Sequence, residues 1–286
     1  MNDSVKDLIS QFVVSLEKNG KSRSTILAYR ADLDQLLEFA TKNNLATIDK
    51  VTIEYLNNFK DMLISQKFAL KTVSRKLNAV KTFFKWALAN RFVKEDPSKS
   101  VEHPKIENVQ PKFLTPLEYR ALRDAARSDS RIYAMIELIL QTGLRISEVA
   151  NLKKDNVGNE FIKIEGYSTQ PERTIPINKP AKDALDKYLM DRPDISSDYL
   201  FVSKTGKPLA VRNIRASVDR FIQKAELPKY SVNDLRTTFI VENIKNGVDL
   251  VLLSQIAGHK RLSTTEKYLK LAGVKESGNK QALIEL

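Results

Sequence analysis

Four residues in the second half of the chain have side chains that could act on a phosphodiester. They are Arg145 in TGLRISEVANL, Arg236 in NDLRTTF, and His259 and Tyr268 in GHKRLSTTEKY. Phosphate oxygens gain negative charge while the phosphorus is attacked, and arginine stabilises that charge because its planar fork donates two parallel hydrogen bonds and stays protonated. A phenol offers a nucleophile, and imidazole, with an ordinary pKa of about 6.5, can donate to a phosphate oxygen or take the phenol proton. These residue types therefore favour covalent attack on a phosphodiester without a metal ion.

The sequence around the two arginines predicts that each lies beside a helix start. Arg145 follows a turn expected at Gly143, and Ser231 with Asp234 forms a capping pair that could open the helix carrying Arg236. A place beside a helix terminus limits the freedom of the backbone, so we expect both guanidiniums to be held in fixed positions.

The histidine and the tyrosine lie near a second pair of predicted helix boundaries. Gly258 should end a helix over 250–257, and His259 follows it directly. The run 263–266 (STTE) has the pattern of a capping box, so the next helix is expected to begin there and to carry Tyr268 in its early part.

Each of these residues has an ordinary explanation when it is taken alone. A single arginine on a helix is usually a surface charge, a lone histidine is more often structural, and a tyrosine just after a helix cap is normally a packing residue. The ordered set is more informative. The motifs TGLR-I-SE, LR-x-x-F and GH-x-x-LSTT-x-x-Y resemble the tyrosine recombinase (phage integrase) family, in its compact Xer-like two-domain type. This resemblance covers most of residues 113–286, and the segment GKSRSTILAYRADL is similar to the core-binding domain of the family.

The resemblance implies a mostly α-helical fold with a small β-sheet (α+β) in two domains. Residues 1–96 would form a helical DNA core-binding domain, residues 97–112 a linker, and residues 113–286 the catalytic domain with a C-terminal exchange segment. The apolar tail 281–286 could pass to a neighbouring protomer as this segment, or it could cap its own domain.

The resemblance also implies site-specific DNA recombination through a 3′-phosphotyrosyl intermediate, in integration, excision or dimer resolution. Tyr268 would join the 3′ phosphate while the 5′ hydroxyl leaves, and no cofactor is expected because the phosphotyrosine conserves the bond energy. The implied partners are double-stranded DNA and further copies of the chain, as a homo-tetramer on two paired sites. The involvement of an accessory protein stays open.

Two positions depart from the family pattern, and both concern proton transfer. The family has a lysine in its β-hairpin loop that protonates the leaving 5′ oxygen, but the loop 165–176 contains no lysine and has Tyr167 at that place. Lys163, Arg173 or the phenol of Tyr167 could substitute. Asn233 stands where the family usually has histidine or lysine, and an amide can donate a hydrogen bond but brings no titrating proton. General acid–base help is worth about 10²–10⁴-fold, so we expect cleavage to be slowed and not abolished.

Composition favours a nucleic-acid partner and disfavours a metal site. The 286 residues include 47 Lys and Arg against 35 Asp and Glu, a formal net charge of +12. A protein with this excess of positive charge is suited to bind a polyanion such as nucleic acid, although many basic proteins never bind one. The absence of cysteine excludes disulfides and thiolate ligands, and two histidines are few for a zinc centre, so no metal ligand is assigned. The sequence shows neither a leader nor an apolar run of roughly 18 residues. We therefore expect a cytoplasmic, nucleoid-associated location.

The N-terminal part has helical patterns over 5–19, 24–43, 53–65 and 71–88, with Ser24 as the expected N-cap of the second helix. On a helical wheel the fourth helix has one apolar and one basic face. The apolar residues are Val73, Leu77, Val80, Phe84 and Leu88, and the basic residues are Lys71, Arg75, Lys81 and Lys85. The basic face could be merely solvated, but a proline-rich linker would let two basic domains clamp a duplex, which favours DNA contact.

The C-terminal part is predicted to be helical around a small hairpin or three-stranded sheet. Thr115 before Pro116 predicts a helix N-terminus, and β-like runs cover 161–164 and 174–177. Further helices are expected over 132–141, 147–152, 181–189, 211–225, 232–245, 250–257 and 264–272. The DNA contacts assigned to this part are Arg173, Arg212, Arg215 and Lys260.

Three other functions stay open from the sequence. A recombinase-fold protein could bind DNA with impaired or partner-dependent cleavage, which Tyr167 and Asn233 favour. A metal-dependent nuclease or transposase would need a compact cluster of carboxylates or histidines, and the sequence has no such cluster. A helical DNA-binding regulator could use 211–225 as a recognition helix, but this would leave the series Arg, Arg, His, Tyr unexplained.

Overall fold

The computed structural model describes residues 4–45, 47–107, 110–166, 171–203 and 205–274. Tyr167 and the tail 281–286 lie outside these ranges. The chain separates into two compact units, residues 1–108 and 109–286, and each has its own hydrophobic core. Within the described residues, no helix is long and apolar enough to span a membrane.

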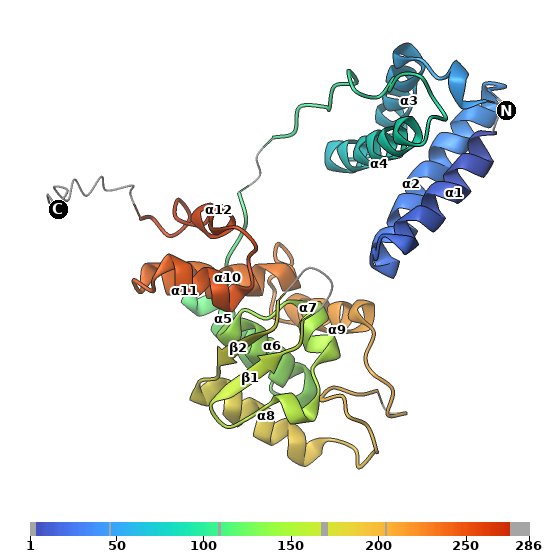
Figure 1. Cartoon of the computed structure of the whole chain (residues 1–286). Coiled ribbons are helices and arrows are strands. Elements are labelled where there is room, and N and C mark those ends of the chain that lie inside the picture. Colours follow the sequence, from blue (N-terminus) through green and yellow to red (C-terminus); the bar gives the residue numbers. More distant parts are fainter. Residues whose placement is uncertain (1–3, 46, 108–109, 167–170, 204, 275–286) are drawn as a thin grey trace, which may run out of the picture. The chain divides into compact units, whose positions relative to one another are not determined.

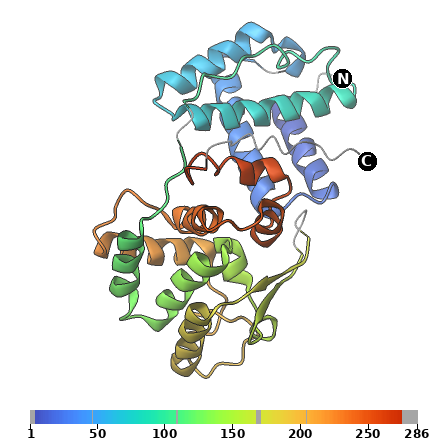
Figure 2. The same ribbon diagram turned by 90° about the vertical axis from the view of Figure 1, so that its left-hand side faces the viewer.

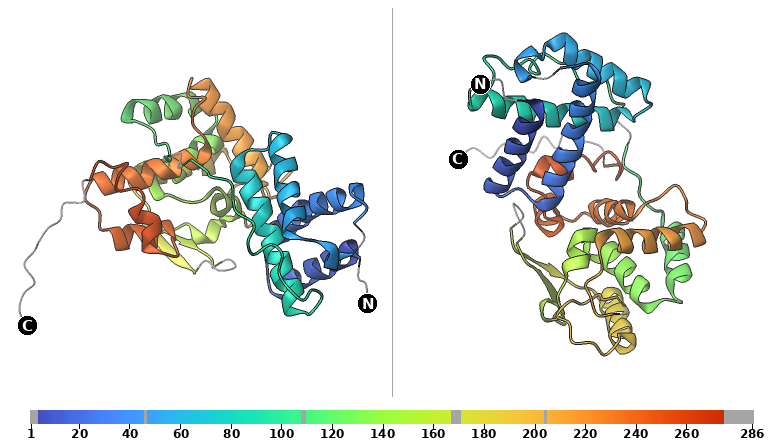
Figure 3. Two further views of the ribbon diagram at one scale, coloured as in Figure 1. Left: turned by 90° about the horizontal axis from the view of Figure 1, so that it is seen from above. Right: turned by 90° about the vertical axis from the view of Figure 1, so that its right-hand side faces the viewer.

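The first unit is built from helices that cross in pairs. They are α1 (Val5–Lys18), α2 (Arg23–Lys42), α3 (Ile53–Ser65) and α4 (Leu70–Ala89), with the 3₁₀ helix η1 (Ile48–Lys50) before α3 (Figure 1). α1 and α2 lie side by side, and α3 and α4 run across them (Figures 2 and 3). The core is rich in aromatic rings, and Phe12, Phe59, Phe83 and Phe84 are fully buried. Burial of each such ring contributes roughly 1.5–3 kcal/mol, so packing holds these helices in place more than their propensities do.

Polar side chains decide where these helices begin. The hydroxyl oxygens of Ser4, Ser22 and Thr52 each accept a hydrogen bond from the backbone N–H three residues later. The predicted N-cap Ser24 is therefore wrong. The second helix begins at Arg23, because Ser22 is the residue whose oxygen reaches a backbone N–H that the helix leaves unpaired.

The apolar stripe of α4 follows the predicted face for most of its length. Val73, Leu77, Val80 and Phe84 are buried, but Leu88 is 40% exposed and Ala87 is buried in its place. An α-helix has 3.6 residues per turn, so an apolar stripe that always advanced by four residues would rotate around the helix. After Phe84 the stripe therefore continues with Ala87, three residues on, and not with Leu88.

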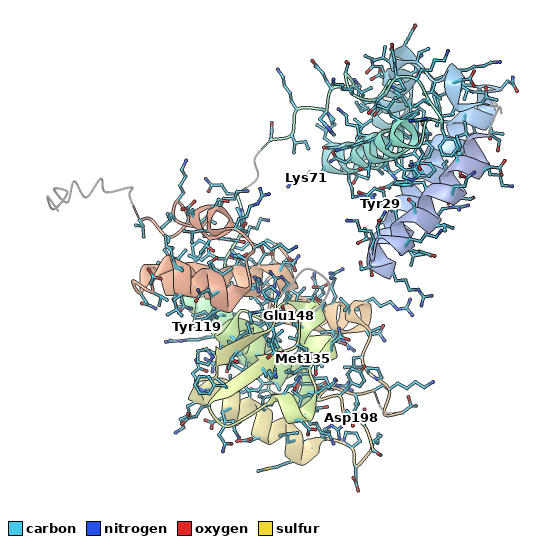
Figure 4. All side chains as sticks on the ribbon, in the orientation of Figure 1. Tyr29, Lys71, Tyr119, Met135, Glu148 and Asp198 are labelled. Carbon is cyan, nitrogen blue, oxygen red and sulfur yellow. The ribbon has the colours of Figure 1, made fainter. Side chains whose placement is uncertain are left out.

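The second unit surrounds one central helix, α6. Its elements are α5 (Pro116–Ala126), α6 (Ser130–Thr142), α7 (Ile146–Asn151), η2 (Lys154–Asn156), β1 (Phe161–Ile164), β2 (Arg173–Pro176), α8 (Lys179–Asp191), α9 (Val211–Lys224), α10 (Val232–Lys245), α11 (Leu250–Ala257) and α12 (Leu262–Glu266). α6 packs against α5, α7, α8, α9 and α10 (Figure 2). Met135 lies in this interior (Figure 4), and the fully buried Glu137 is paired with Arg123 of α5.

The β-hairpin brings one charged residue to the edge of α11. β1 and β2 pair antiparallel, with Ile162 opposite Ile175 and Ile164 opposite Arg173. The two isoleucines of the first pair are buried, which matches the alternation expected of a half-buried strand. Because β2 also contacts α11, its first residue, Arg173, lies next to the end of that helix.

The segment after α11 differs from the prediction. α11 ends at Gly258 in a left-handed conformation (φ 64°), as expected, but α12 begins at Leu262 with Arg261 in the N-cap position. The predicted capping box at 263–266 is therefore wrong. α12 is a short helix of five residues. Tyr268 follows it in a turn, where the Tyr268 backbone N–H donates to the carbonyl oxygen of Thr265 at 3.0 Å.

Candidate active site

Arg145 lies where the chain turns sharply between two helices. α6 ends at Thr142, and Gly143 follows with a φ of 65°, a conformation that costs a residue with a Cβ roughly 1–2 kcal/mol. A Cβ at this position would also collide with the ring of Phe239. Arg145 then occupies the N-cap position of α7. The turn fixes the backbone that carries its guanidinium.

A half-buried carboxylate, Glu148, joins two arginines. Its Oε1 accepts from Arg145 Nη1 at 3.0 Å, and its Oε2 accepts from the Arg145 backbone N–H at 2.8 Å and from Arg173 Nη2 at 2.9 Å. Glu148 lies on α7 (Figure 4). Burial alone would raise its pKa, but the hydrogen bond from Arg173, that from the Arg145 N–H and the two positive charges outweigh burial and hold the pKa of Glu148 below its ordinary value. The carboxylate therefore stays ionised and orients both guanidiniums.

At the C-terminal end of α11, three arginines each donate a hydrogen bond to one of three successive backbone carbonyl oxygens. The pairs are Arg173 Nε with Ile256 O at 2.9 Å, Arg236 Nη2 with Ala257 O at 2.6 Å, and Arg145 Nη2 with Gly258 O at 2.6 Å. The last carbonyls of a helix have no partner within the helix, and they carry the negative end of its dipole, equivalent to roughly half a charge. Together with Glu148 they offset part of the repulsion among three guanidiniums. The cluster keeps a net positive charge, as a phosphate site requires.

Arg236 is held near the start of α10. It lies in the second turn of α10, which Ser231 and Asp234 open as the predicted capping box, and its Nη1 donates to Gly143 O. Burial lowers the pKa of Arg236 to about 10, and the positive charge of Arg145 acts in the same direction. The guanidinium remains charged at neutral pH.

His259 is a neutral imidazole in this surrounding. Burial lowers its pKa to about 4, and the charges of Arg236, Arg145 and Arg173 lower it as well. Its Nδ1 shares a hydrogen bond of 2.8 Å with the hydroxyl of Thr265, which is buried. Since Nδ1 is engaged, Nε2 is the ring nitrogen left for a substrate or for the phenol.

Tyr268 lies beside His259. The two rings are almost parallel, at 8°, with centroids 6.3 Å apart. Tyr268 packs at the edge of a small apolar cluster formed by α10 and α11, which includes Phe239 and Leu253. Four groups from three separate segments of the sequence, Arg145, Arg236, His259 and Tyr268, thus come together at the end of α11.

Arg173 and His259 border a cleft of about 510 Å³. It is lined by Pro171, Glu172, Arg173, Gln255, Gly258, His259 and Lys260. Within the described ranges, no group of three or more His, Cys, Asp or Glu side chains is arranged to hold a metal ion.

Comparison with known proteins gives the family. Residues 112–273 match the phage integrase family, and residues 9–91 match its N-terminal SAM-like domain. This chain is a tyrosine recombinase of the phage integrase family. The predicted family and the mostly helical, two-domain fold with a small sheet are confirmed.

The relatives of this recombinase cover nearly the whole chain. Tyrosine recombinase XerC of Halalkalibacterium halodurans is 31% identical over 281 residues, which is 91% of each chain. The crystal structure of XerA recombinase is 28% identical with a TM-score of 0.54, over 92% of this chain and 93% of that one. A lambda integrase dimer bound to a COC′ core site has a TM-score of 0.77 at 16% identity, over 99% of this chain and 81% of that one, a likeness that concerns the fold alone.

Four further predicted site residues of the recombinase are exposed: Asn233, Lys260, Arg212 and Arg215. Asn233 is exposed in the first turn of α10, one turn before Arg236. Lys260 is exposed and lines the cleft. Arg212 and Arg215 are exposed in the first two turns of α9.

The predicted basic face of the first unit is only partly free. Lys71 (Figure 4) and Lys85 are exposed, and Lys81 is half-buried. Arg75 is 51% exposed but pairs with Asp32, a buried carboxylate of α2.

Sequence reasoning gave no role to Glu148 or Thr265, although both lie inside the motifs. The SE of TGLRISE places Glu148 three residues after Arg145, a helix-start spacing that could have shown it. Thr265 has no comparable signal, since only the fold turns its hydroxyl toward His259. Arg173 was predicted as a DNA contact, which stays a prediction, and its side chain is only 9% exposed.

Proposed function

We propose that this recombinase exchanges DNA strands at specific sites with Tyr268 as its nucleophile. The observation that carries the proposal is the end of α11, where three guanidiniums on successive carbonyls adjoin a neutral His259 and the Tyr268 ring. This arrangement suits a group that becomes more negative as it reacts, which is what a phosphodiester does.

In the proposed reaction, the Tyr268 oxygen bonds to phosphorus while the bond from phosphorus to the 5′ oxygen breaks. The phenol proton passes to His259 Nε2 or to water, and the 5′ oxygen takes up a proton as it leaves. Arg145 and Arg236 donate to the non-bridging oxygens and stabilise the charge that develops there. Resealing reverses these steps with a new 5′ hydroxyl, so the bond energy is kept in the phosphotyrosine.

The proton donor to the 5′ oxygen remains a prediction. Asn233 is exposed one turn from Arg236 and can donate a hydrogen bond, but it has no proton to give up at neutral pH. Tyr167 lies outside the described residues. Slower cleavage than in a protein with a hairpin lysine is the expected consequence.

The proposed substrate is duplex DNA, bound by several copies of the chain. Solved lambda integrases that share this fold include a dimer bound to a core site and a tetramer bound to a Holliday junction. A net charge of +12 and exposed basic residues in both units support phosphate contact here. A role for 281–286 in joining neighbours, an accessory protein and association with the nucleoid stay predictions.

The test is formation of a covalent complex on a duplex that carries a nick near the cleavage point, so that the freed strand end diffuses away. The sequence of this duplex is found by selecting, from a pool of duplexes, those that the full chain binds. We expect a denaturation-resistant complex with the unchanged chain and none with Tyr268→Phe. The variant Tyr230→Phe, which removes the phenol that donates to Glu118 of α5 at 2.8 Å, is the matched control and should retain the complex. Binding without any Tyr268-dependent complex would leave a DNA-binding protein with impaired or partner-dependent cleavage.

A further inference from the structure

The third arginine of the cluster has one donor that the fold does not use. Arg173 Nε donates to Ile256 O at 2.9 Å and Nη2 donates to Glu148 Oε2 at 2.9 Å. Nη1 is buried and has no hydrogen-bond partner among the described residues. The side chain as a whole is 9% exposed, so the charge is held in place and is not a loose surface group.

A buried N–H without a partner is unusual. More than nine in ten buried polar groups in folded proteins are hydrogen-bonded, because leaving one unpaired destabilises the fold. Joining Glu148 to the end of α11 requires only Nε and Nη2. A purely structural role for Arg173 therefore leaves Nη1 unexplained, whereas an acceptor brought by the substrate would explain it.

The spare nitrogen lies beside the cleft and beside the first phosphate-binding arginine. A Cβ built on Gly258 would lie 3.0 Å from Arg173 Nη1 and 3.1 Å from Arg145 Nη1. The two guanidiniums thus converge on one side of Gly258. Arg173 and Gly258 both line the cleft that also contains His259.

We propose that Arg173 is a third phosphate ligand of the active site, whose Nη1 donates to a non-bridging oxygen of the phosphodiester that Tyr268 attacks. The inference rests on the proposed function, since it adds a residue to the same site. Two of the three nitrogen atoms of the guanidinium are fixed by Ile256 and Glu148, so the third is presented without freedom to turn away. Such a fixed donor stabilises developing charge without reorganisation.

The experiment is a double-mutant cycle between Arg173 and the charge of one phosphate, measured in the full chain with Tyr268→Phe so that no cleavage intervenes. Dissociation constants are measured for the selected duplex and for duplexes in which single phosphates are replaced in turn by uncharged methylphosphonates. The cycle compares Arg173→Ala with its parent. Arg127→Ala, which removes a 70% exposed arginine at the end of α5, is the control.

We expect Arg173→Ala to weaken binding of the unmodified duplex at least tenfold more than binding of the duplex neutralised at the reacting phosphate, and Arg127→Ala to show no such difference. The reacting phosphate is identified with the unchanged chain, from the position of the Tyr268 complex. Equal weakening on every duplex would overturn the proposal, because an arginine that acts only through folding does not sense the charge of one phosphate.

Two further measurements keep the result clear. Thermal unfolding shows whether Arg173→Ala still folds, and Arg173→Lys serves as a second variant, since its single ammonium can pair with Glu148 but cannot also reach the phosphate. It should lose the coupling while keeping the fold, and retention of full coupling in Arg173→Lys would also contradict the proposal. If no Tyr268 complex forms at all, the proposed function is contradicted. The series of methylphosphonate duplexes would still show whether Arg173 is coupled to the charge of one phosphate, so the two failures can be distinguished.

Discussion

At the scale of single residues, the site depends on backbone groups as much as on the side chains that react. Three carbonyls at the end of α11 hold the guanidiniums of Arg145, Arg173 and Arg236, and Glu148 links two of them. The sequence motifs pointed to Arg145 and Arg236 because arginine types and spacings are visible in a sequence. The carbonyls carry no residue identity, so no pattern of side chains could have shown that they gather the arginines.

Gly258 is the residue on which this arrangement depends most closely. Its φ is 64°, and an added Cβ would lie 2.9 Å from Arg173 Cζ and 3.1 Å from Arg145 Nη1. We predict that Gly258→Ala destabilises the fold by about 1–2 kcal/mol and lowers the rate of Tyr268 complex formation by more than tenfold. Urea unfolding and complex formation on the nicked duplex are the measurements.

Gly273 provides the control for the glycine prediction, since it also has a positive φ but, within the part of the chain that the structure describes, no atom lies within 4 Å of a built Cβ. Gly273→Ala should share the conformational cost and keep the rate. Equal rates for the two variants would show that the arginines do not need the space at Gly258.

His259 predicts a pH dependence of stability. Its pKa is lowered from 6.5 to about 4 in the folded state by burial and by the neighbouring arginines. Between these two values the unfolded chain binds a proton that the folded chain does not, so stability must fall as the pH is lowered from 6.5 towards 4. We expect His259→Gln to remove this part of the decline, measured as the melting temperature at a series of pH values. Identical pH profiles for both chains would contradict the assigned pKa.

At the scale of elements, the helices were largely predictable and their boundaries less so. Apolar spacing gave α1 to α4, and local caps gave the starts of α5 and α10, because these signals lie within a few residues. The predicted start of the helix after His259 was wrong because STTE has the local pattern of a capping box, yet the helix begins two residues earlier, at Leu262 and not at Thr264. The buried role of Arg173 was also out of reach, since only the packing of β2 against α11 covers that side chain.

The pair of aspartates on α2 illustrates how tertiary contacts separate residues that look alike in sequence. Asp32 is buried and pairs with the buried Lys76 at 3.0 Å and with Arg75, whereas Asp34 is 43% exposed and pairs with Arg30 at 2.8 Å. We predict that Asp32→Ala costs about 3–5 kcal/mol, because it leaves Lys76 charged and unpaired in the core. Asp34→Ala should cost about 0.5 kcal/mol or less. Denaturant unfolding of the full chain measures the loss of stability in each variant. Similar losses for both would contradict the larger contribution assigned to the buried pair.

At the scale of the whole molecule, the first unit is expected to share in DNA binding. Lys71 and Lys85 are exposed on α4. Removing one lysine that neutralises a phosphate should reduce the slope of log K against log salt concentration by roughly 0.9. The double variant Lys71→Ala, Lys85→Ala should therefore lower the slope by roughly 2, while Lys187→Ala on the exposed side of α8 should leave it unchanged. An unaltered slope in the double variant would place the DNA on another surface.

The central claim is that Tyr268 forms a bond to DNA. The most direct measurement is mass spectrometry of peptides from the covalent complex after nuclease digestion, combined with sequencing of the attached strand. We predict a nucleotide joined through its 3′ phosphate to the peptide that contains Tyr268. A nucleotide found on another residue, or attached through a 5′ phosphate, would contradict the account.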